Sequence, residues 1–197
     1  MRFKILPLII LLFVNFCFAQ NYSLNNIFIK QGNRLIEIKQ TENNIKLHPS
    51  DFSIEYLNKP YEEKKGLFYN AQALITGSAV DVSLKDGSEI TSIAYFEPGT
   101  GFSAEKNEVI NYPFLSSDGH QYLYYVSKKD KRIDKIGVSG NWDIYSWTLK
   151  GVYQYDAEID WSDYENDQVH IVFIIDRNLD GLLQSGEYYT LHINFEK

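Results

Sequence analysis

The chain has 197 residues with 19 basic and 26 acidic side chains, and its formal net charge is −7. This acidic balance argues against nucleic acid as a partner, because phosphates require a basic protein surface. The length suits one domain with a full-sized hydrophobic core.

The N-terminus has the pattern of a secretory signal peptide. Arg2 and Lys4 precede an apolar run over residues 5–14, and Ala19 provides a small residue before Gln20. These features predict cleavage after Ala19, with residues 1–19 as the signal peptide. The apolar run is shorter than the about 20 residues that a membrane-spanning helix needs.

Cys17 leaves lipidation as an alternative to simple cleavage. The bulky Phe16 stands where a lipoprotein signal has a small residue, and this favours cleavage. The ending Phe18-Ala19-Gln20 resembles exported proteins of Gram-negative bacteria. We therefore expect the protein in the periplasm, on the outer cell surface or secreted.

Cleavage after Ala19 leaves a mature chain of 178 residues, 20–197, with 17 basic and 26 acidic residues and a net charge of −9. The single cysteine of the sequence lies in the signal, so disulfides are excluded as stabilising links in the mature chain. The acidic charge is compatible with cation binding and with solubility in salt.

Apolar residues in the mature chain recur with a period of two, which is typical of strands. Segments with this character are 26–30, 34–39, 52–56, 67–76, 79–84, 90–96, 122–126, 142–149, 152–159, 169–175 and 188–195. Turn residues such as Gln31-Gly32-Asn33 and Lys150-Gly151 separate neighbouring segments, and no stretch of twelve residues predicts an amphipathic helix. The pattern predicts an all-β fold, a single antiparallel β-sandwich domain over residues 20–197.

A long segment over residues 97–118 breaks this rhythm with many turn-forming residues. Two interpretations stay open: a loop that carries function, or a surface excursion that covers a sheet edge.

The segment from Asp176 to Glu187 fits the twelve-position calcium loop D-x-[DN]-x-[DN]-G-x5-E without a gap. The predicted ligands for Ca²⁺ are Asp176, Asn178, Asp180, the carbonyl of Leu182, Gln184 and Glu187. Gly181 provides the sharp turn, and Leu183 is an apolar residue at position eight. An oxygen-only ligand set suits a hard cation and not zinc or copper. The alternative is a plain turn, because Asp, Asn and Gly are also ordinary turn residues.

Strand-like sequences flank the loop on both sides, over 169–175 and 188–195. From Phe173 to Leu191 the segment resembles the EF-hand-like loops between strands in B-repeat domains of bacterial surface adhesins. It is also similar to the calcium loops of dockerin and thrombospondin type-3 repeats, which lack the flanking strands. The resemblance is local and implies a rigid, stabilising calcium site, not a sensor whose helices move apart.

A second acidic group precedes the strand 169–175 and consists of Asp156, Glu158, Asp160, Asp163, Glu165 and Asp167. It lies at the opposite end of that strand from Asp176, roughly 23 Å away at about 3.3 Å per residue, so it cannot complete the calcium site. We consider a solvated sheet face, a weak cation site and a glycosidase-like carboxylate pair for this group.

Signatures of other chemistry are weak or absent. The histidines His48, His120, His170 and His192 are scattered, and His170 within an apolar strand favours a core histidine. The sequence has no nucleophile elbow, no His-Glu-x-x-His and no phosphate-binding glycine loop. A basic run over residues 128–132 favours a solvated turn, with contact to an anionic glycan or membrane surface as the alternative.

Two functions from different classes remain. The first is a non-enzymatic binding, adhesion or structural module at the bacterial cell envelope, with calcium and a glycan or protein ligand as partners. Its candidate aromatic platforms are Trp142, Tyr145, Trp147, Tyr153 and Trp161. The alternative is an envelope hydrolase of glycosidase type that uses carboxylates of the 156–167 group.

Overall fold

The computed structural model describes residues 21–40, 43–59, 71–77, 79, 82–93, 96, 114–115, 121–123, 133–154 and 157–196. The predicted signal peptide, the basic run 128–132 and all of the segment 97–118 except residues 114–115 lie outside these residues.

The first sheet has five strands in the order β2-β1-β4-β9-β8, and every pairing in it is antiparallel. Its strands are β1 (Asn26–Gln31), β2 (Arg34–Lys39), β4 (Phe52–Asn58), β8 (Ile133–Ser139) and β9 (Trp142–Leu149). The sequence pattern matches β2 and β9 from end to end.

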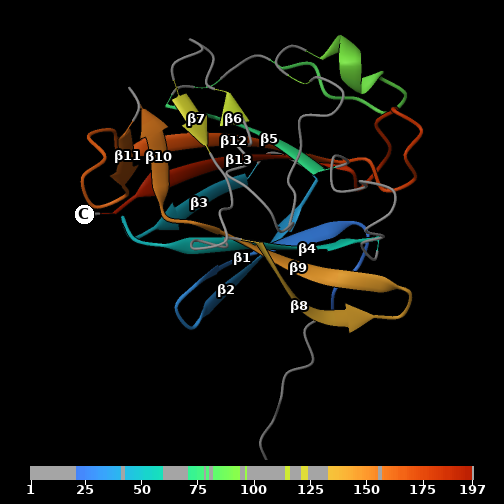
Figure 1. Cartoon of the computed structure of the whole chain (residues 1–197), viewed down its shortest axis with the longest axis horizontal. Coiled ribbons are helices and arrows are strands. Elements are labelled where there is room, and N and C mark those ends of the chain that lie inside the picture. The colour runs from blue at the N-terminus through green and yellow to red at the C-terminus, as the bar shows by residue number, and fades with distance from the viewer. Residues whose placement is uncertain are drawn as a thin grey trace, which may run out of the picture.

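The second sheet has the order β3-β13-β12-β5 and lies across the core from the first (Figure 1). Its strands are β3 (Asn43–Leu47), β5 (Ala71–Thr76), β12 (Gln168–Ile175) and β13 (Tyr188–Phe195). β13 pairs with β12 in antiparallel register and with β3 in parallel register. The all-β sandwich is therefore confirmed, with one parallel pair among the strands that the structure describes.

A third, smaller sheet has the order β11-β10-β7-β6 and lies near β12 and β13 (Figure 1). It consists of β6 (Phe114–Leu115), β7 (Gln121–Leu123), β10 (Gly151–Gln154) and β11 (Ala157–Asp160). Lys150 alone separates β9 from β10, so the chain passes from the first sheet to the third at the predicted turn.

The main core forms where alternating residues of the two larger sheets meet. Ile29 and Tyr56 of the first sheet and Phe173 and Leu191 of the second are fully buried there. A second apolar cluster covers the other face of β12 and contains Val172, Ile174 and Leu183. β12 is therefore buried on both faces, which explains its nearly continuous apolar sequence.

Three predicted strands are wrong in detail. Residues 90–96 include the 3-10 helix η2 (Ile90–Ser92), and the described residues among 79–84 form no strand. The segment 152–159 is divided between two paired strands, β10 and β11, because the chain reverses between them. Among the described residues, no helix has the length and apolar character needed to cross a membrane.

Candidate functional site

The loop from Asp176 to Glu187 joins the two central strands of the second sheet, as the sequence predicts. The N–H of Ile175 donates to the carbonyl oxygen of Glu187 at 2.7 Å, so the two ends of the loop are held together. This hydrogen bond follows directly after Ile174 and Tyr188, which are the last paired residues of the two strands. The loop is therefore attached at both ends to a hairpin with a buried face.

Asp176 organises the first half of the loop through its carboxylate. Its Oδ1 accepts from the N–H groups of Leu179 at 2.8 Å and Asp180 at 3.2 Å, and its Oδ2 accepts from that of Gly181 at 2.9 Å. Gly181 has φ +76°, and Leu179 has φ +64°, which is uncommon for a residue with a side chain. The carboxylate therefore stabilises a tightly wound turn that glycine completes.

Asn178, Asp180 and Gln184 form a polar cluster on the exposed side of the loop. Asp180 Oδ2 accepts from Asn178 Nδ2 at 2.8 Å and from Gln184 Nε2 at 2.9 Å, and Asp180 Oδ1 accepts from the N–H of Leu182 at 2.9 Å. Three of the predicted ligands are thus brought together by direct contacts.

Glu187 is buried and closes the opposite side of the loop. Its Oε1 accepts from the N–H of Arg177 at 2.8 Å, and its Oε2 accepts from the N–H of Gln184 at 3.1 Å. Burial raises the pKa of the Glu187 carboxyl, and the nearby Asp176 adds to the rise, while these hydrogen bonds oppose it. The positive charge of Arg177 also opposes the rise in pKa, so the chain itself supplies a cation that favours the charged form of Glu187.

The donor set consists of carboxylate, amide and carbonyl oxygens, and its chemistry fits Ca²⁺. In the described part of the chain, no group of three or more His, Cys, Asp or Glu side chains is arranged to hold a metal ion by those side chains alone. Asp176, Asp180 and Glu187 instead direct their carboxylates to N–H groups of the loop. A carboxylate oxygen that accepts an N–H group keeps a further lone pair, so these hydrogen bonds are compatible with coordination of an ion.

Arg177 is a buried residue of the loop whose contacts the sequence analysis missed. Its side chain is 4% exposed, and it donates from Nε to the carbonyl oxygen of Leu57 at 2.9 Å and from Nη1 to those of Leu24 at 3.2 Å and Gly186 at 2.5 Å. Burial lowers the pKa of the Arg177 guanidinium, and the charge and hydrogen bond of Tyr189 oppose this. The visible signal is a basic residue at position two of an otherwise acidic loop.

Leu183 anchors the loop to the second apolar cluster. It is fully buried, its N–H donates to the carbonyl oxygen of Ser88 at 2.8 Å, and its own carbonyl oxygen accepts from the N–H of Gly87 at 2.8 Å. The N–H of Ile90 donates to the carbonyl oxygen of Gly181 at 2.9 Å. The segment 87–90 thus runs beside the loop and fixes its second half.

The predicted aromatic platforms are mostly core residues. Trp147, Trp161 and Tyr145 are each at most 2% exposed, so their assignment as platforms is wrong. Tyr145 and Trp147 alternate with the polar residues Ser146 and Thr148 in β9 and face inward, whereas Trp161 lies in the turn after β11 and packs against Phe52 and Phe195. Trp142 is half-buried, and the side chain of Tyr153 lies outside the described residues.

The acidic group 156–167 does not join the loop. Asp160, Asp163, Glu165 and Asp167 are all exposed, as the interpretation of a solvated face requires. Asp156 and the side chain of Glu158 lie outside the described residues.

Two of the histidines lie together, although they are 22 positions apart in the sequence. His170 and His192 are direct cross-strand partners on β12 and β13, with ring centroids 4.5 Å apart and an interplanar angle of 88°. Spacing along the sequence could not reveal this, because it depends on strand register.

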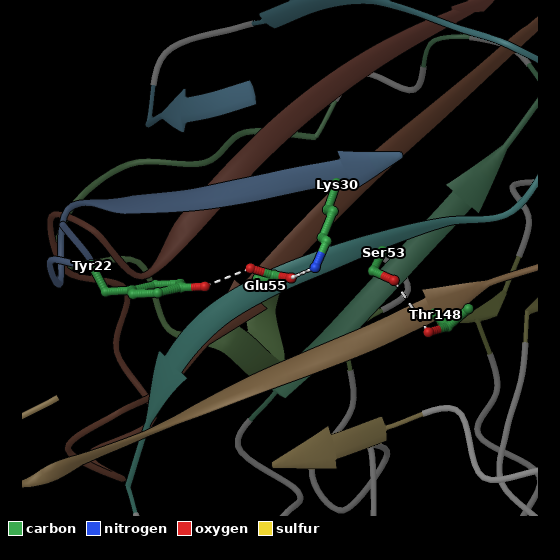
Figure 2. Close-up of polar contacts among 5 residues, drawn as sticks. All are labelled: Tyr22, Lys30, Ser53, Glu55 and Thr148. Carbon is green, nitrogen blue, oxygen red and sulfur yellow. Dashed lines mark hydrogen bonds and ion pairs between the residues drawn. The ribbon is translucent and has the colours of Figure 1, made fainter. Parts of the chain in front are cut away.

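The outer face of the first sheet carries a polar groove of about 440 Å³ that is lined in part by Lys30, Ser53 and Glu55. Glu55 is 2% exposed, and Tyr22 donates a hydrogen bond from its hydroxyl to Glu55 Oε2 (Figure 2). Lys30 Nζ lies 3.7 Å from Glu55 Oε1, and Ser53 and Thr148 bond through their hydroxyls at 3.1 Å. The segment before β1 is therefore fastened across this face.

Comparison with protein-family models, with curated proteins and with solved structures finds no match to this chain. The functional assignment therefore rests on the geometry of the chain's own residues.

Proposed function

We propose that the protein is an exported, non-enzymatic binding or structural module of the bacterial cell envelope, stabilised by Ca²⁺ in the loop Asp176–Glu187. The observation that carries the proposal is the position of this loop. The loop joins two buried strands, and the residues at its two ends are hydrogen-bonded to each other. All of its candidate ligands for a metal ion are oxygen atoms. The N-terminal charge and apolar pattern support export.

The electrostatics give calcium a stabilising role. Asp176 and Glu187 are both buried, and the charge of Asp176 raises the pKa of Glu187. A divalent cation between them offsets this repulsion and replaces the lost hydration of the carboxylates. The ion therefore acts on the stability of the hairpin β12–β13, not on a large change of shape.

The size of the effect follows from mass action. Extracellular calcium modules have dissociation constants of about 10⁻⁴ to 10⁻³ M, so millimolar calcium adds about 1 kcal/mol to the free energy of unfolding. For a domain of this length, that is a rise of about 2–4 °C in Tm.

The test is thermal unfolding of the mature chain in calcium and in chelator. We expect the Tm to rise with calcium, and Glu187→Gln to remove most of the rise, because the closing carboxylate loses its charge. The matched control is Glu165→Gln, which makes the same chemical change at an exposed glutamate outside the loop. An unchanged Tm with and without calcium, in protein shown to be metal-free, would reduce the loop to an ordinary turn.

A further inference from the structure

His170 and His192 lie side by side in a polar row on the outer face of the second sheet. His170 of β12 is directly opposite His192 of β13, and on its other side it is directly opposite Thr76 of β5. His192 is in turn directly opposite Asn44 of β3. Residues in such positions point to the same face of a sheet. Ile171, the next residue along β12, belongs to the main core, so the row faces away from that core.

The two imidazole rings border a small cavity. Its volume is about 20 Å³, and it is also lined by Thr76, Thr190 and Val172. Both histidine side chains are half-buried. A cavity of about 10–15 Å³ is enough for one water molecule. The space beside the rings therefore has room for one water molecule or one metal ion.

The distance between the rings fits two ligands of one ion. Their centroids are 4.5 Å apart, with an interplanar angle of 88°. Two imidazoles that bind one ion through bonds of about 2.0–2.1 Å have centroids about 4.5–5 Å apart, depending on the angle at the ion. Because the torsion that directs a histidine ring is broad, a turn about the Cβ–Cγ bond can aim one nitrogen of each ring at the ion. Binding therefore requires no movement of the strands.

The nitrogen ligands select the kind of metal. Imidazole suits zinc, copper, nickel and iron, whereas calcium and magnesium prefer oxygen. The pair is also distant from the loop Asp176–Glu187, because five residues of β12 at about 3.3 Å each place His170 roughly 17 Å from Ile175. The two sites therefore share no ligand.

The residues on either side of the pair are compatible with a bound cation. In the next row of the same face, Asn194 is opposite both Gln168 and Lys46. The ammonium of Lys46 forms an ion pair with Glu196 at 2.8 Å. The positive charge that β3 brings to this face is therefore already offset.

We propose that the His170–His192 pair is a binding site for a divalent transition metal ion, with Cu²⁺ bound more tightly than Ni²⁺ or Zn²⁺. One nitrogen of each ring coordinates the ion, water fills the remaining positions, and Thr76 and Thr190 offer hydroxyls to that water. The ion links β12 to β13. This site goes beyond the proposed calcium function and does not depend on it.

The test uses the mature chain and metal ions alone. Calorimetric titration with Cu²⁺ should show a bound ion, and electron paramagnetic resonance should show coordination by two nitrogens. His170→Gln and His192→Gln should each weaken binding at least about tenfold, since either change leaves a single imidazole. Calcium at millimolar concentration should not compete, because it prefers oxygen ligands.

The matched control is the double variant His48→Gln, His120→Gln, which leaves the pair as the remaining histidines of the chain. It should bind Cu²⁺ with the affinity of the unaltered protein. Equal affinities in His192→Gln and the unaltered protein, or loss of binding in the control, would overturn the inference.

The spectrum of the unaltered protein decides the question even if the variants at positions 170 and 192 fail to fold. Coordination of Cu²⁺ by oxygen alone, or by a single nitrogen, overturns the site. Because the pair shares no ligand with the loop, the response of Tm to calcium should be the same in His192→Gln as in the unaltered protein. Failure of the histidine site therefore leaves the proposed calcium function intact.

Discussion

Arg177 Nε lies 2.9 Å from the carbonyl oxygen of Leu57, and this hydrogen bond joins the loop of the second sheet to the end of β4 in the first. The same guanidinium bonds Leu24 in the segment before β1. One buried cation thus connects the loop with the first sheet, and backbone carbonyls replace the hydration of its Nε and Nη1, while Nη2 is buried without a hydrogen-bond partner.

Substitution of Arg177 by Met should lower the free energy of unfolding by about 2 kcal/mol, because buried carbonyl oxygens lose a charged donor. The matched control is Arg34→Met, since the exposed Arg34 donates from Nη1 to the carbonyl oxygen of Lys46 at 2.7 Å. We expect the control to change stability by less than about 0.5 kcal/mol in urea unfolding. Equal losses in the two variants would contradict the role of Arg177 as a buried link.

Leu183→Ala should cost about 3 kcal/mol, because it leaves a cavity in the second apolar cluster where Leu183 is fully buried. The side chain of the neighbouring Leu182 is 36% exposed, so Leu182→Ala should have little effect on stability. Chemical unfolding of both variants without calcium checks the difference. Similar losses of unfolding free energy in the two variants would show that Leu183 does not anchor the loop.

Gly186→Ala should be far more damaging than Gly32→Ala. A Cβ on Gly186 would lie 2.3 Å from the carbonyl oxygen of Leu24, whereas one on Gly32 meets nothing within 4 Å. Both residues have positive φ, so each variant bears about 1–2 kcal/mol of backbone strain, and the collision adds to it at Gly186 alone. The difference is measured by the urea concentrations at which the two variants are half unfolded. Equal midpoints would refute the close contact between Gly186 and the carbonyl oxygen of Leu24.

Stability should fall at alkaline pH because of buried tyrosines. Burial raises the pKa of Tyr22, Tyr56 and Tyr145, and Glu55 and Asp143 reinforce the rise for Tyr22 and Tyr145. Their stabilising contribution is complete below the unfolded value of about 10 and is lost as pH rises from there toward the folded values. Unfolding free energies between pH about 8 and about 11 should therefore decline, and less steeply in Tyr22→Phe. An unfolding free energy that does not change over this pH range would contradict the role of the tyrosines.

The fold could be predicted from the sequence where strands bury one face or both. β13 was predicted from end to end because its buried residues alternate along the whole strand, and β9 because apolar residues alternate from Tyr145 to Leu149 and turn residues bound it. β3 and β8 were missed, since β3 (Asn43–Leu47) has two buried residues and β8 is an edge strand with exposed Ile136 and Val138. Periodicity does not distinguish such strands from turns.

The loop was predictable because all its residues are consecutive, and its flanking strands are as expected. The residues that surround the loop could not be predicted from the sequence. Leu57 meets Arg177 only through the packing of two sheets, and His170 meets His192 only through register. The platform prediction was wrong for Trp147 because its strand turns that face toward the core.

The parallel pairing of β3 with β13 has a consequence for how the chain folds. In the second sheet, the early strands β3 and β5 flank the hairpin β12–β13 on either side and do not pair with each other. Each therefore lacks its hydrogen-bonded neighbour until residues 168–195 have emerged. Contacts this distant in sequence form slowly, so the second sheet can be completed only after almost the whole chain has been synthesised.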